Sequence, residues 1–202
     1  MVARIRLAVL VGCCALGATS CGLDEIVRKT FPQNLPVTFY IDEAFTEDER
    51  EEIIAAMEDW NVKASERLQD RQIALIFGGL VQHTDFVYPL FVDGAHVVYK
   101  IYEPVPDIEW IRSNYDYDVA GYATKGDVLI LCYIIFPESI VSRDVWTAYL
   151  KDVRRIAVHE FGHNLGLSHF DNVPGVMNLH SDFAELTQND LDAFCTLYEC
   201  EF

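Results

Sequence analysis

The chain has 202 residues, of which 51% are hydrophobic and 23% are charged, so it can form one domain with a sizeable core and is not composed like a disordered protein. Fifteen Lys and Arg stand against 32 Asp and Glu, which gives a formal net charge of −17. This balance argues against a nucleic-acid-binding protein and against electrostatic docking on anionic lipid, because both need an excess of cations.

The N-terminus has the pattern of an export signal. Arg4 and Arg6 precede the uncharged apolar run of residues 7–18, which is too short to span a bilayer as a helix. The small residues before Cys21 resemble the end of a bacterial lipoprotein signal, in which the cysteine becomes a lipidated N-terminus. We therefore predict an exported protein that is anchored to the cell envelope through Cys21. A signal that ends at Cys13, or plain secretion, is the alternative.

This interpretation divides the chain into three parts. We predict a signal over residues 1–20, a tether over residues 21–34 and a single domain over residues 35–202. The last part has no internal repeat, low-complexity tract or Pro/Gly-rich linker. Contact with a membrane is expected only through the N-terminal lipid.

Three cysteines remain outside the predicted signal and anchor, namely Cys132, Cys195 and Cys200. Their small and odd number argues against a disulfide scaffold. Cys195 and Cys200 are the nearest pair, but continuous helix would place them on different faces, so a bridge requires the helix to end between them. Three buried thiols are the alternative.

The predicted strands come from alternating or β-rich runs, and a long loop is expected over residues 103–118. The turn Lys125-Gly126 would join the last two of these strands. They are expected over residues 36–41, 73–77, 96–102, 119–124 and 127–134.

Three helices are predicted from their caps and apolar periodicity. The capping box Thr46–Glu49 starts a long amphipathic helix with apolar residues from Ile53 to Leu68. Ser142 or Asp144 caps a second long helix, whose apolar stripe reaches Leu165, and residues 186–190 start a C-terminal helix that ends near Tyr198. This order predicts an α/β sheet with helices packed on it, in one domain.

The end of the second helix carries a metal-binding pattern. His159 and His163 are four residues apart, so on a helix both imidazoles can reach one Zn²⁺ at about 2.0–2.1 Å. His169 would leave that face in a continuous helix, so we expect Gly166 to turn the chain, because glycine adopts positive φ without steric cost. Three histidines leave a fourth position for water, which is the arrangement of a catalytic zinc.

Glu160 adjoins the first of these histidines and is the candidate general base. It could accept the proton of a zinc-bound water, whose pKa falls towards about 7, and pass it to the departing amine after the attack on a carbonyl. A zinc bound only for stability would instead need a fourth protein ligand, and Asp171 or His180 could supply it.

The spacing H-E-x-x-H-x-x-G-x-x-H over residues 159–169 resembles the signature of the metzincin metallopeptidases. Val176-Met177-Asn178 resembles their Met-turn, in which a methionine lies beneath the metal ligands. The nearest likeness is to the matrixins (matrix metalloproteinases), and it extends through residues 186–198. The resemblance implies an α/β (α+β) zincin-like catalytic domain with a twisted, mostly parallel sheet, an antiparallel edge strand, two long helices including the active-site helix, a Met-turn and a C-terminal helix.

The same resemblance implies a monomeric zinc endopeptidase with one catalytic Zn²⁺ and a protein or peptide substrate. The strand over residues 119–124 would be the cleft edge, where Gly121, Tyr122 and Ala123 pair with an extended peptide by strand addition. His180 would line the pocket. An exported zinc-binding adhesion or binding lipoprotein with an inactive peptidase fold is the alternative.

The sequence also departs from the matrixin pattern. Phe170 follows the third histidine, where matrixins usually have Ser or Thr. His83 and Asp85 are similar to the His-x-Asp of their structural zinc, but a polar surface role is favoured for His83 and His96. Carboxylates that could bind Ca²⁺ occur at Asp107, Glu109, Asp116 and Asp118, but no loop has calcium-ligand spacing, so Ca²⁺ is unsupported and a solvated acidic loop is favoured.

Overall fold

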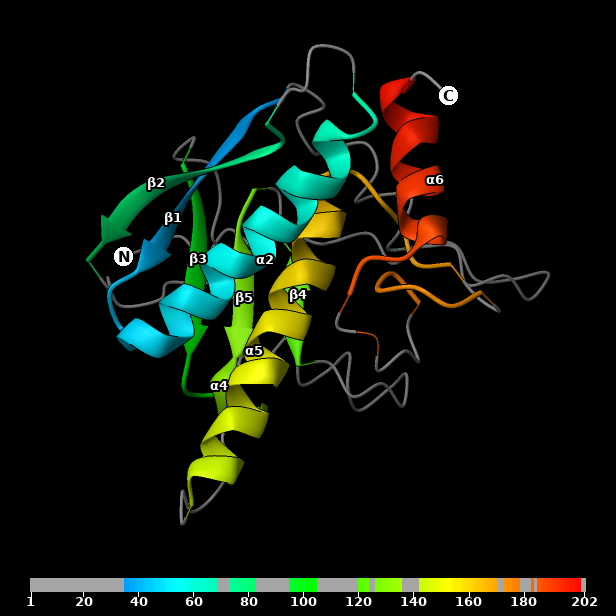
Figure 1. Ribbon diagram of the computed structural model, residues 1–202. Coiled ribbons are helices and arrows are strands. Elements are labelled where there is room, and N and C mark those ends of the chain that lie inside the picture. The colour runs from blue at the N-terminus through cyan, green and yellow to red at the C-terminus, as the bar shows by residue number, and fades with distance from the viewer. Residues whose placement is uncertain are drawn as a thin grey trace, which may run out of the picture.

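The computed structural model describes residues 35–68, 73–82, 95–104, 120–123, 126–135, 142–170, 173–178, 183 and 185–200. The predicted signal, tether and Cys21 lie outside these residues and stay predictions. The elements follow one another in the expected order of strand, helix, strands, helix and helix (Figure 1). They are β1 (Val37–Asp42), α2 (Glu47–Ser65), β2 (Leu75–Val81), β3 (His96–Ile101), β4 (Gly121–Ala123), β5 (Val128–Leu131), α4 (Cys132–Ile135), α5 (Arg143–Asn164) and α6 (Gln188–Tyr198).

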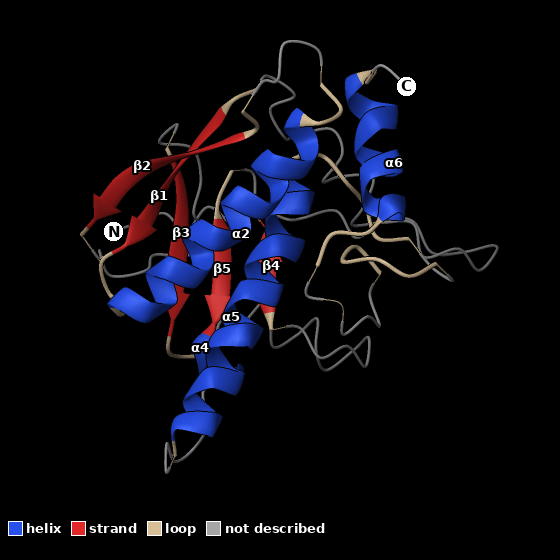
Figure 2. Ribbon diagram, viewed as in Figure 1, coloured by secondary structure: helices blue, strands red, loops and turns tan. Residues whose placement is uncertain are grey.

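The strands form one sheet in the order β2-β1-β3-β5-β4 (Figure 2). The pairs β1–β2, β1–β3 and β3–β5 are parallel, and β4 runs antiparallel to β5 at the edge. The register shifts once, between Phe39 and Tyr40, opposite Gly79, which has a φ of +116°. The mixed α/β class with a mostly parallel sheet and an antiparallel edge strand is thus confirmed.

Two strand boundaries differ from the prediction. The strand expected over residues 73–77 begins at Leu75 and continues to Val81, because the irregular register at Gly79 lets the edge strand run through a glycine pair. The strand expected over residues 127–134 ends at Leu131, and Cys132–Ile135 is a short helix. A continuous apolar run has no period that could separate the two structures.

Helices α2 and α5 lie side by side on one face of the sheet (Figures 1 and 2). The capping box at α2 is confirmed, since Thr46 N–H donates to Glu49 Oε2 at 2.6 Å and Glu49 N–H donates to Thr46 Oγ1 at 3.4 Å. Ser142, not Asp144, caps α5 through Val145 N–H. The fully buried Trp60 of α2 donates its indole N–H to the carbonyl of Val158 in α5 at 2.9 Å. This buried hydrogen bond therefore joins α2 to α5 within the core.

Helix α6 ends in a disulfide. Cys195 and Cys200 are bridged with their Cα atoms 4.8 Å apart. The helix ends at Tyr198, and Glu199 takes a left-handed φ of 50°, so the condition that the helix must end between the two cysteines is met. Cys132 is a buried free thiol, whose pKa burial raises to about 11.

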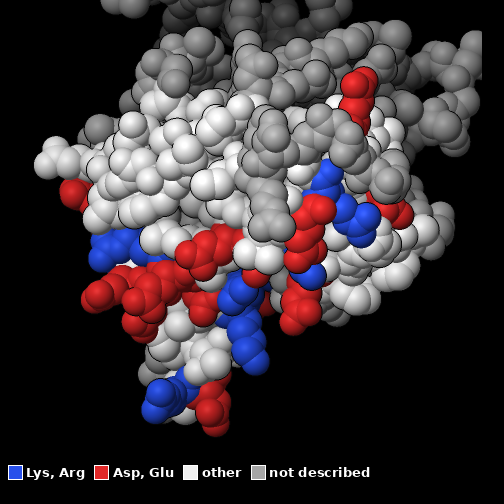
Figure 3. Space-filling view, turned by 45° about the horizontal axis from the view of Figure 1, so that its top comes forward, with Lys and Arg blue, Asp and Glu red and all other residues white. Residues whose placement is uncertain are grey.

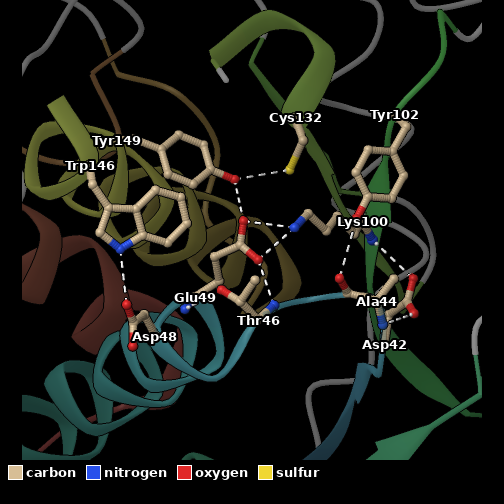
Figure 4. A network of polar contacts seen from close by, with 10 residues as sticks. All are labelled: Asp42, Ala44, Thr46, Asp48, Glu49, Lys100, Tyr102, Cys132, Trp146 and Tyr149. Atoms are coloured by element: carbon tan, nitrogen blue, oxygen red, sulfur yellow. Dashed lines mark hydrogen bonds and ion pairs between the residues drawn. The ribbon is translucent and has the colours of Figure 1, made fainter. Parts of the chain in front are cut away.

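A buried polar network joins the first turn of α2 to β3 and α5 (Figure 4). Lys100 donates to Glu49 at 2.5 and 2.7 Å, and the Tyr149 hydroxyl donates to the same carboxylate at 2.5 Å. Burial acts to raise the pKa of Glu49, but the hydrogen bonds from Lys100, Tyr149 and the Thr46 backbone outweigh it, so the pKa is lowered. Burial likewise opposes the charge of Lys100, yet Glu49 raises its pKa. The ion pair therefore stays charged in the core.

The surface carries both signs of charge. On the face in Figure 3, Asp and Glu side chains are interspersed with Lys and Arg, and its described part shows no continuous basic area. Among the residues that the structure describes, no helix combines the length and apolar character needed to cross a membrane.

Candidate metal centre

Three imidazoles converge at the end of α5. The Nε2 atom of His159 lies 3.1 Å from that of His163 and 2.9 Å from that of His169, and the last two Nε2 atoms are 3.0 Å apart. His163 is buried, whereas His159 and His169 are partly exposed. The three histidines predicted from their spacing are thus brought together.

Backbone carbonyls orient two of the rings through their other nitrogen. His159 Nδ1 lies 2.5 Å from the carbonyl oxygen of Val176, and His163 Nδ1 lies 2.8 Å from that of Leu167. Because a carbonyl oxygen can only accept, Nδ1 carries the proton in both rings and Nε2 presents a lone pair to the centre.

The donor set fits a divalent cation. Burial is the main cause that lowers the pKa of His159 and His163 to about 3 and of His169 to about 4, and the neighbouring imidazoles add to it. The Nε2 lone pairs of His159 and His163 and the Nε2 atom of His169 therefore face a common point, where a cation can bind. Tetrahedral nitrogen ligands of zinc, at about 2.0–2.1 Å, lie roughly 3.3 Å apart. The observed separations are within a few tenths of an ångström of this value, so the residues fit zinc.

The turn after α5 is built as expected from Gly166. The helix ends at Asn164, and Gly166 takes a φ of +89°, a conformation that favours glycine. The N–H of Gly166 donates to the His163 carbonyl at 2.8 Å, and the N–H of Leu167 donates to the Gly162 carbonyl at 2.9 Å. These bonds close the helix and turn the chain back, which brings His169 to the other two rings.

Met177 lies in the core directly against α5. Its side chain is fully buried, and a Cβ atom at Gly162 would collide with its Sδ atom. Gly162 lies between His159 and His163 in the sequence of α5, so the methionine packs against the stretch of helix that carries both histidines. The preceding residue, Val176, supplies the carbonyl that orients His159. The role of Met177 as a floor beneath the metal-binding residues stays a prediction.

Asp190 holds the Met177 turn and was not predicted as a site residue. Its fully buried carboxylate accepts the N–H groups of Val176 at 3.0 Å and Met177 at 3.1 Å. It also accepts the N–H and hydroxyl of Thr187, each at 2.8 Å. The sequence signal was the capping box of Thr187 and Asp190, which indicates a helix start but not this second role.

Glu160 is buried between the helix and the edge strand. Burial raises its pKa to about 8, and a hydrogen bond from the Ala123 backbone acts in the opposite direction. Its side chain fills the space beside Gly121, where an added Cβ would lie 2.6 Å from Oε1. The candidate base is therefore in contact with the strand predicted to bind substrate.

Of the other predicted site residues, some face α5, some point elsewhere and some lie outside the described residues. Gly121 and Ala123 face α5, whereas Tyr122 lies between them on a strand and points to the opposite face of the sheet. His96 Nδ1 donates a hydrogen bond to the Gly126 carbonyl at 2.9 Å, and its ring packs on Phe39, so it is not part of the cluster of three imidazoles. The remaining candidates lie outside the described residues, namely His83, Asp85, Asp107, Glu109, Asp116, Asp118, Asp171 and His180.

The comparison with family models agrees with this geometry. The matrixin model matches residues 33–199, which is most of the chain. The comparison with curated proteins gives no match. The chain therefore belongs to the matrixin family of zinc metallopeptidases.

Proposed function

We propose that this protein is a zinc-dependent endopeptidase in which His159, His163 and His169 hold one catalytic Zn²⁺ and Glu160 is the general base. The observation that carries the proposal is the convergence of three Nε2 atoms within 2.9–3.1 Å of one another. Zinc in this position would polarise the scissile carbonyl and make water a better nucleophile at neutral pH.

Glu160 is suited to move the proton. It follows His159 directly on α5, and its buried side chain lies against the edge strand on which a peptide would be held. Its carboxylate takes the proton from the attacking water as the carbonyl carbon becomes tetrahedral. The same oxygen then delivers this proton to the amide nitrogen, so that the departing amine leaves neutral.

Strand β4 is suited to hold an extended peptide. It pairs with β5 on one side only in the described sheet, and Ala120 accepts from Leu131 N–H at 2.9 Å on that side. Backbone groups alternate along a strand, so those of Gly121 and Ala123 point away from β5, on the side where the Ala123 backbone hydrogen-bonds to Glu160. A substrate that adds there as a further strand lies beside Glu160. His180 stays a predicted pocket residue.

Export and a lipid anchor at Cys21 are part of the proposal. The N-terminal pattern supports them, and so does the Cys195–Cys200 disulfide, because disulfides persist mainly in oxidising compartments. Metabolic labelling with a radioactive fatty acid tests the anchor. Wild type should be labelled and Cys21→Ser should not, and an unlabelled wild type rejects the anchor.

The test of function is Glu160→Gln, with the exposed Glu51→Gln as a control for the same loss of charge. Both variants should bind one zinc per chain by elemental analysis. Cleavage of an unfolded protein, in the absence and presence of a hydroxamate inhibitor, should fall by about 10²–10⁴-fold in Glu160→Gln and stay unchanged in the control. Undiminished cleavage by Glu160→Gln would reject the assigned base, and a wild type that holds zinc without cleaving would support the binding-protein alternative.

A further inference from the structure

The turn that leads from His163 to His169 is contacted by a residue near the end of the chain. The Tyr198 hydroxyl donates a hydrogen bond to the carbonyl oxygen of Leu165 at 3.0 Å. Leu165 is the buried C-cap of α5. Since the last carbonyls of a helix have no partner within the helix, this bond satisfies one carbonyl at the end of α5.

From Leu165 the turn leads directly to two of the imidazoles. The carbonyl of Leu167 accepts the Nδ1 proton of His163 at 2.8 Å, and His169 follows two residues later. Gly166 lies between Leu165 and Leu167 in the chain and packs near Leu197 of α6. A displacement of the Leu165 carbonyl would therefore move both the acceptor that orients His163 and the segment that carries His169.

A disulfide closes the short segment that contains Tyr198. Tyr198 lies between Cys195 and Cys200, within the short segment that the bridge closes. The N–H of Cys200 donates to the Cys195 carbonyl at 3.3 Å, and the Tyr198 ring stacks on Phe194 with centroids 4.4 Å apart. Helix ends fray readily, and the bridge restrains the last turn from which Tyr198 reaches Leu165.

We propose that Tyr198 is a positioning residue for the metal-binding turn and that the Cys195–Cys200 disulfide keeps it in the position from which it acts. This inference takes one assumption from the proposed function, namely that the bound ion is zinc. Tyr198 acts through the Leu165–Leu167 turn on the imidazoles. The role is therefore measured as metal affinity and not as peptide cleavage.

The first experiment compares Tyr198→Phe with Tyr102→Phe. The control loses the same kind of bond, because the Tyr102 hydroxyl donates to the Ala44 carbonyl at 3.2 Å, away from the three histidines. Zinc dissociation constants of the apoproteins are measured by competition with a chromophoric chelator. Tyr198→Phe should weaken zinc binding by about tenfold and change the visible absorption bands of the Co²⁺-substituted protein, whereas the control should stay within about twofold. An unchanged affinity and spectrum in Tyr198→Phe would overturn the proposal.

The second experiment is a cycle that adds the double variant Cys195→Ser/Cys200→Ser and the triple variant with Tyr198→Phe. If the bridge acts through Tyr198, the double variant also weakens zinc binding, and Tyr198→Phe then adds little to it. Effects that multiply independently would reject the link between bridge and tyrosine. If the bridge-free chain does not fold by circular dichroism, Tyr198→Phe alone decides. Loss of zinc affinity in Tyr198→Phe, together with undiminished cleavage by Glu160→Gln, would reject the assigned base and leave the positioning role in place.

Discussion

Replacing Asp190 by Asn should destabilise the protein and loosen the metal centre together. One carboxylate oxygen accepts from Val176 and twice from Thr187, and the other accepts from Met177 N–H. Asn keeps one acceptor and places an NH₂ group opposite a buried N–H. A buried donor without a partner costs about 1–3 kcal/mol, and the remaining bonds lose their charge assistance, so we expect a loss of about 2–4 kcal/mol in unfolding free energy.

Urea unfolding of the apoprotein measures this loss, and chelator competition measures zinc affinity in the same variants. Because Val176 supplies the carbonyl that orients His159, zinc binding should weaken by about tenfold. Asp192→Asn is the matched control, since Asp192 is an exposed acid on the same helix. If Asp190→Asn unfolds within 0.5 kcal/mol of the control, roughly the scatter of surface substitutions, the anchoring role of the carboxylate is refuted.

Two further predictions concern the core. Lys100→Met should cost about 3–5 kcal/mol near neutral pH, because it leaves the Glu49 carboxylate buried without its cation. Burial, the largest influence on Glu49, then raises its pKa, so protonation favours the folded state. The penalty relative to wild type should shrink as pH falls through the raised pKa, and a penalty independent of pH in urea titrations from pH 4 to 8 contradicts this. Gly162→Ala should cost about 1–2 kcal/mol by thermal or urea unfolding, because the Cβ displaces Met177 while a better helix former offsets part of the strain. A neutral or stabilising result shows that Met177 has room to move.

The elements that the sequence predicts well are those with local causes. The capping box at Thr46 and the cap at Ser142 involve residues three apart, so the starts of α2 and α5 follow from short patterns. The end of β5 does not, because Val128–Ile135 is apolar throughout and its change from strand to helix comes with tertiary contacts, among them that of Cys132 with Tyr149. Similarly, the irregular register at Gly79 depends on pairing with β1, which is distant in sequence.

The same division holds at the metal centre. His159, His163, Gly166 and His169 fall within one short segment, and their roles follow from helix spacing and one left-handed glycine. The contact of Glu160 with Gly121 joins α5 to an edge strand 39 residues earlier in the chain, and no local pattern encodes it. The hydrogen bond from Tyr198 to Leu165 joins residues that are 33 positions apart, and no local pattern in the sequence predicts it either. Such contacts arise from tertiary packing, which spacing within one segment does not report.

The three imidazoles lie in one short segment, so metal binding and the proposed catalysis depend on different parts of the fold. All three belong to residues 159–169, whereas the environment of Glu160 requires the edge strand beside it. We expect mild denaturant that unfolds the edge strand β4, while α5 stays folded, to abolish the proposed hydrolysis before zinc is released. Under the proposed function, inactive protein from a damaged or ageing preparation can therefore retain a full complement of metal, so metal content alone does not measure peptidase activity.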